Sequence, residues 1–178
     1  MIQGAILEKG EQYYTRFGKI FHTLHNFQTE YNWLITDCVA YPQNERTAAG
    51  IEQAAHGSYN WFRGDELTEL LEAEDFQWIW AVLSGFDPSI PKEEVLSVSL
   101  RNHALPKAVD YEGFWQQTLS IQHPLAAVEL AAFDSSGMLL ISRQEKLVKK
   151  FRQTFPLSED LAVHNARLAQ HGCHPPCM

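Results

Sequence analysis

The stretch LAAVELAAFDSSGMLLIS (residues 125–142) decides the fold class. Two apolar segments flank DSSG (134–137), four residues of the kind that form tight turns between strands. We therefore expect a β-hairpin, although the alanine-rich first arm could also form a helix. Glu129 interrupts that arm. In an alternating strand its carboxylate would point away from Val128 and Leu130 to an exposed face, the alternative being a carboxyl with a raised pKa.

Further strands and helices are expected before and after this hairpin. FQWIWAVL (76–83) is apolar on both alternating faces, which is typical of a central strand that is covered on both sides. YNWLITDCVAY (31–41) and SYNWF (58–62) are rich in β-branched and aromatic residues and also favour strands. A short first strand is expected within 4–10. The segment 42–57 lacks periodicity and is expected to be a long loop with at most a helical turn.

Apolar side chains at helical spacing predict several helices. The first includes Phe17, Ile20 and Phe21. Capping residues mark where later helices begin, and a serine followed three residues on by glutamate forms a capping box. The expected caps and segments are Asp65 for 65–75, Asp110 for 111–119, the Ser142-to-Glu145 capping box for the helix ending before Pro156, and Ser158 for 159–170. This order predicts an α+β fold, a largely antiparallel sheet with helices packed mainly on one face.

Length and composition favour one domain at 1–170, with 171–178 as a Cys/His-containing tail. The chain has 178 residues, and 45% of them are hydrophobic, enough for a sizeable core. Acidic residues outnumber basic ones by 22 to 14, giving a net charge of −8. This charge argues against nucleic acid and favours a basic protein partner, although it could simply keep the chain soluble. With neither a leader nor a membrane-length apolar run, we expect a cytoplasmic protein without membrane contact.

An acidic segment offers the first candidate site, a partner-binding surface. Its carboxylates would attract a basic protein, and aromatic residues just before it could serve as anchors. A solvated helix face is the alternative. The candidate residues are Trp61, Phe62, Asp65, Glu66, Glu69 and Glu72.

The tail offers a second candidate site, for zinc. Thiolate and imidazole are good zinc ligands, and four such donors lie within seven residues, with His164 or Cys38 as possible additions. The alternative, which we favour, is a terminus that binds no metal and a protein without a cofactor. The four donors are His171, Cys173, His174 and Cys177.

Catalysis by Cys38 is a third hypothesis. A nucleophilic thiol needs a lowered pKa and a histidine base, and nothing in the sequence links a histidine to Cys38. A buried thiol that packs as a small hydrophobe is the simpler interpretation. No phosphate-binding loop, nucleophile elbow, dinucleotide fingerprint or kinase signature occurs, so an enzyme is less expected than a binding protein.

The layout of hairpin and helix in FDSSGMLLISRQEKLVKKFRQTFPLSEDL (133–161), with the tryptophan-rich strand at 76–83, resembles small acidic uncharacterised bacterial proteins. Some proteins of this type are encoded beside toxins as their cognate immunity proteins. The resemblance implies a non-enzymatic inhibitor of a basic partner. It covers about three quarters of the chain and excludes 42–57 and the tail, and it assigns no functional residue.

Overall fold

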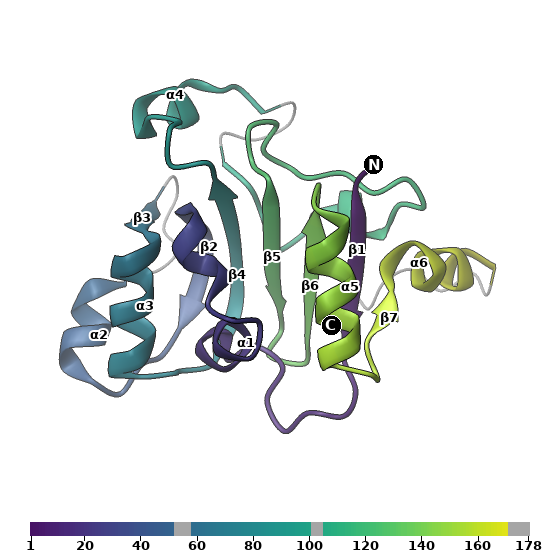
Figure 1. The fold of residues 1–178 in the computed structure, drawn as a ribbon, viewed down its shortest axis with the longest axis horizontal. Coiled ribbons are helices and arrows are strands. Elements are labelled where there is room, and N and C mark those ends of the chain that lie inside the picture. The colour runs from purple at the N-terminus through teal and green to yellow at the C-terminus, as the bar shows by residue number, and fades with distance from the viewer. Residues whose placement is uncertain (52–57, 101–104, 171–178) are drawn as a thin grey trace.

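The computed structural model describes residues 1–51, 58–100 and 105–170 (Figure 1). Within these residues, seven strands form one antiparallel sheet in the order β3-β2-β4-β5-β6-β1-β7. The strands are β1 Gln3–Leu7, β2 Asn32–Ala40, β3 Tyr59–Arg63, β4 Trp78–Phe86, β5 Val128–Phe133, β6 Gly137–Ser142 and β7 Glu159–Asp160. The helices are α1 Phe17–Thr23, α2 Glu45–Gly50, α3 Gly64–Ala73, α4 Lys92–Ser97, α5 Glu145–Thr154 and α6 Leu161–Gln170, with 3-10 turns η1 Phe27–Glu30 and η2 Glu112–Trp115. The predicted α+β fold is confirmed.

The structure contains the predicted hairpin, and β4, Trp78–Phe86, overlaps the central strand expected at 76–83. β5 pairs with β6 from Val128 opposite Ser142 to Phe133 opposite Gly137. Asp134 and Ser135 adopt left-handed φ values of 46° and 57°, which tight turns require. β4 is the third strand from the β3 edge, between β2 and β5, and is almost wholly buried.

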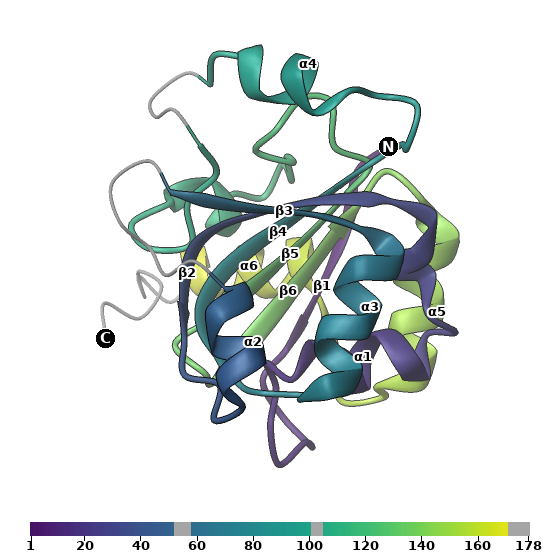
Figure 2. The same ribbon diagram turned by 90° about the vertical axis from the view of Figure 1, so that its left-hand side faces the viewer.

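Both faces of the sheet are covered, as Figure 2 shows, because alternate side chains of each strand point to opposite faces. Helices α1, α3 and α5 cover the first face and bury Phe17, Leu67 and Phe151 there. The second face is covered by α4, by the start of α6 and by the segment 105–127, which buries Phe114. The sheet therefore separates two apolar cores.

A bulge in β2 fixes the segment that covers the second face. Asp37 has a φ of 51°, and the register of β2 against β4 shifts just after Thr36. The Asp37 carboxylate accepts N–H groups of Ala108 and Val109 at 2.8 and 2.9 Å. The hydroxyl of Thr36 donates to the Pro106 carbonyl at 2.7 Å. The chain continues through this irregularity as one strand, so the site is a β-bulge and not a turn.

Two predicted helix starts are wrong because neighbouring segments set the backbone there. Asp110 has a left-handed φ of 57°, whereas a capping residue has extended backbone, and only the short turn η2 follows it. Ser142 remains in β6, and its hydroxyl accepts the N–H of Gln144 at 2.9 Å. Helix α5 then begins at Glu145 without a capping box.

The starts of α3 and α6 are each displaced from their predicted positions. α3 begins at Gly64, before Asp65, and the Glu66 carboxylate accepts the N–H of Arg63 at 2.8 Å. β7 pairs with β1 before α6 begins, so Asp160, not Ser158, caps this helix. The Asp160 Oδ1 accepts N–H groups of residues 162 and 163 at 3.0 and 3.2 Å.

Candidate functional site

The acidic face of α3 carries charges that differ in how far they are neutralised. Arg63 pairs with Asp65 at 3.1 Å and with Glu66 at 3.3 Å, and its hydrogen bond to Asp65 lowers the pKa of that carboxyl. Glu69 and Glu72 are exposed and form no ion pair with any described residue. Asp65 and Glu66 raise the pKa of Arg63 more than Glu69 does, so Glu69 and Glu72 are the least neutralised charges of this face.

Glu74 and Asp75, which continue the acidic run, hold other segments in place. The two oxygens of Glu74 each accept a backbone N–H, from Gln43 and Asn44, both at 2.8 Å. Asp75 accepts N–H groups at the start of α1, both at 2.9 Å. Burial raises the pKa of Asp75 against the lowering effect of these hydrogen bonds. These two carboxylates stabilise the fold and are not free to attract a partner.

The structure separates the two candidate anchors, Trp61 and Phe62. They are adjacent in β3 and therefore point to opposite faces of the sheet. Phe62 packs against the core beneath α3, whereas Trp61 stacks on Phe86 on the second face with ring centroids 5.9 Å apart. Only Phe62 therefore lies on the side of the sheet that carries the acidic helix.

The structure bears on only one of the two hypotheses that involve cysteine, zinc binding by the tail and catalysis by Cys38. The tail donors His171, Cys173, His174 and Cys177 lie outside the described residues, so the zinc hypothesis stays a prediction. Cys38 is 2% exposed, and burial raises the pKa of its thiol to about 12. A thiol in this environment is protonated at neutral pH and is a poor nucleophile.

Glu129 is fully buried, so the expectation that it faces solvent is wrong. Its side chain points to the second face, opposite Ser84 in register, where residues 105–127 cover it. Its Oε2 accepts the N–H of Gln122 at 3.1 Å, while burial raises the pKa of Glu129 to about 8. The alternation of β5 was predicted correctly, but cover on both faces was expected only for the strand 76–83, and the structure extends that cover to β5.

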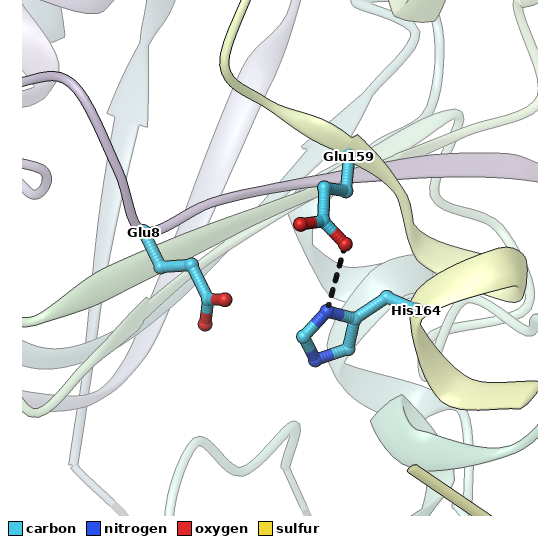
Figure 3. A group of neighbouring side chains, drawn as sticks. All are labelled: Glu8, Glu159 and His164. Carbon is cyan, nitrogen blue, oxygen red and sulfur yellow. Dashed lines mark ion pairs between the residues drawn. The ribbon is translucent and has the colours of Figure 1, made fainter. Parts of the chain in front are cut away.

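A further group of side chains, Glu8, Glu159 and His164, meets at the β7 edge of the sheet, next to β1 (Figure 3). Their potential ligand atoms all lie within 4.8 Å of one another. His164 Nδ1 is 3.5 Å from Glu159 Oε2, and the His164 side chain is 7% exposed. Lys9 and Arg167 bind the same Glu159 carboxylate at 3.0 and 2.7 Å.

These charges join the residues just after β1 to β7 and α6, about 150 residues later in the sequence. Hydrogen bonds, first from Lys9 and then from Arg167, lower the pKa of Glu159. Of this group, only His164 was singled out from the sequence. The pairing of β7 with β1 brings Glu159 to Glu8, and a two-residue strand has no periodicity that could reveal it.

The fold and the surface thus define the class of this protein: an α+β protein with an antiparallel sheet and one acidic surface helix. Comparison with family models, curated proteins and solved structures finds no match for this chain. In the part of the chain that is described, no helix has both the length and the apolar composition that a membrane span needs.

Proposed function

We propose that this protein is a non-enzymatic interaction module that binds a basic partner protein through the outer face of α3. The observation that carries the proposal is the exposure of Glu69 and Glu72 on a helix that the core holds rigid through Leu67 and Leu71. Neither carboxylate has an ion-pair partner among the described residues. Two exposed carboxylates on a helix that is held in place favour electrostatic steering of a cationic partner.

The finer proposal is an immunity-type inhibitor, which covers a basic protein and blocks its activity. It rests on the layout resemblance described above and on the excess of acidic residues. Phe62 lies on the α3 side of β3 and is the candidate anchor on that side of the sheet. Trp61 would contribute only to an interface that also reaches the second face. Nucleic acid is disfavoured as the partner because phosphates would be repelled by α3.

The test compares two double substitutions that remove the same charge from different places. Glu69→Gln with Glu72→Gln neutralises the α3 face, and Glu93→Gln with Glu94→Gln neutralises exposed residues of α4. The partner is recovered on the wild-type chain from the host lysate, identified by native mass spectrometry and purified. Its association rate with each variant is then measured at low and high salt.

We expect the α3 variant to associate at least about tenfold more slowly at low salt, with the difference shrinking at high salt. The α4 variant should associate at nearly the wild-type rate. Equal slowing by both variants would mean that net charge, and not the α3 face, sets the association rate. Unchanged rates for both variants would refute an α3 interface.

A further inference from the structure

Glu8, Glu159 and His164 form a donor set of two carboxylates and one imidazole. Glu8 follows the end of β1, Glu159 lies in β7, and His164 is on α6, so three elements converge on one point (Figure 3). Oxygen and imidazole donors together suit first-row divalent ions such as Mn²⁺, Fe²⁺ and Zn²⁺. We propose that these three residues bind one such metal ion, a role that goes beyond partner binding by α3.

The geometry requires only a small contraction of the group. Metal–ligand bonds of about 2.0–2.2 Å place adjacent ligand atoms roughly 3.0–3.6 Å apart. The ligand atoms of Glu8, Glu159 and His164 already lie within 4.8 Å of one another. The two glutamate side chains are 35% and 26% exposed and can shift by side-chain rotation, whereas the surrounding protein fixes the imidazole. Three protein ligands leave further coordination positions for water or a substrate.

Two cations compete with a metal for this site. Lys9 Nζ lies 3.0 Å from one Glu159 oxygen, and an Arg167 nitrogen lies 2.7 Å from the other and 3.2 Å from His164 Nδ1. Their side chains are 55% and 48% exposed, so both can move into solvent. Exposed ion pairs of this kind are weak, so a divalent ion can displace them. Removing Arg167 should therefore strengthen metal binding.

The donors of this site also separate it from a zinc site in the tail. Mn²⁺ prefers oxygen and imidazole ligands, whereas Cys173 and Cys177 would provide thiolates, which select zinc. Titration with Mn²⁺ therefore reports on the carboxylate group. Glu8 is the best position for a first substitution, because among the described residues it forms one ion pair, a long one of 3.9 Å to Lys9, and its loss leaves the Glu159 network intact.

The experiment measures Mn²⁺ binding to the full-length, metal-free chain by isothermal titration calorimetry and electron paramagnetic resonance. The variants are Glu8→Gln, His164→Gln and Arg167→Gln, and Glu72→Gln is the control for lost negative charge. A Cys173→Ser and Cys177→Ser double variant tests the tail. Thermal unfolding without metal shows that each variant is folded.

We expect one Mn²⁺ per wild-type chain, with affinity at least about tenfold lower in Glu8→Gln and His164→Gln. Affinity should rise in Arg167→Gln and stay unchanged in the Glu72 and cysteine variants. The proposal is overturned if the wild-type chain shows no saturable binding. It is equally overturned if binding survives in both Glu8→Gln and His164→Gln, or is lost with the two cysteines. None of these outcomes depends on partner association, which the α4 and α3 variants test separately.

Discussion

At the scale of single residues, carboxylates that accept backbone N–H groups hold loops and helix starts against the rest of the fold. Each lies on or beside the sheet and accepts hydrogen bonds from a loop or from the start of a helix. They account for part of the acidic excess, so the net charge of −8 overstates the charge that is free to meet a partner. These residues are Asp37, Glu74, Asp75 and Glu129.

Glu129 should make the free energy of unfolding depend on pH. Its pKa is about 8 in the folded protein, above the ordinary value of 4.5, so its ionisation disfavours the folded state. The stability contributed by its protonated form is complete below pH 4.5. It decreases as the pH rises and is lost once the pH passes about 8. The pKa shift implies a loss of at most about 3.5 kcal/mol between pH 5 and pH 8.

Glu129→Gln should abolish this loss and be more stable than the wild type at pH 8. Urea unfolding followed by tryptophan fluorescence at several pH values between 5 and 8 measures the difference between the two chains. Glu72→Gln, which changes an exposed carboxylate, should follow the wild-type pH profile. Parallel profiles for Glu129→Gln and wild type would contradict a buried carboxyl that titrates in this range.

At the scale of elements, the sequence predicts the helices and strands that local sequence patterns specify. It does not predict element boundaries that depend on contacts between distant segments. The hairpin follows from its turn residues, the strand expected at 76–83 from a continuous apolar run, and the buried face of α1 from helical spacing. The start of α6 does not, because pairing of β7 with β1 moves the cap from Ser158 to Asp160. The Glu8, Glu159 and His164 group depends on this same long-range pairing.

The start of α3 also depends on a close approach of two backbones. A Cβ at Gly64 would lie 2.3 Å from the carbonyl oxygen of Gln28 and 2.6 Å from the Cα of Thr29, both in η1. Because neither backbone atom can move independently, Gly64→Ala should push α3 away from η1. We expect a loss of about 1–3 kcal/mol, as for overpacked cores.

Chemical denaturation of Gly64→Ala, compared with Gly137→Ala, tests this close approach. The nearest atom to a Cβ at Gly137 is 3.6 Å away, so alanine fits there. Gly137→Ala should change stability little. A Gly64→Ala chain as stable as the wild type would mean that α3 and η1 are farther apart than described.

At the scale of the whole molecule, the first face carries opposite charges at its two sides. In Figure 1, α1 lies between α3 and α5. α3 exposes Glu69 and Glu72, whereas α5 carries four cations, two of them in ion pairs, Lys149 with Glu145 and Arg152 with Asp160. A basic partner would therefore be drawn to the α3 side and turned away from α5, which gives the proposed contact an orientation.

The second face differs from the first because a segment with little regular structure covers it. Phe114 belongs to the short turn η2, yet it is fully buried, and its carbonyl accepts a hydrogen bond from Asn165 of α6 at 2.9 Å. If this segment is part of the core, Phe114→Ala should cost about 3–5 kcal/mol, as truncation of a buried phenylalanine usually does.

Phe151→Ala, in the helical core of the first face, is the matched comparison. Urea unfolding followed by circular dichroism should give similar losses and one transition for both variants. A loss below about 1 kcal/mol for Phe114→Ala alone would instead identify 105–127 as a cover that opens independently of the sheet.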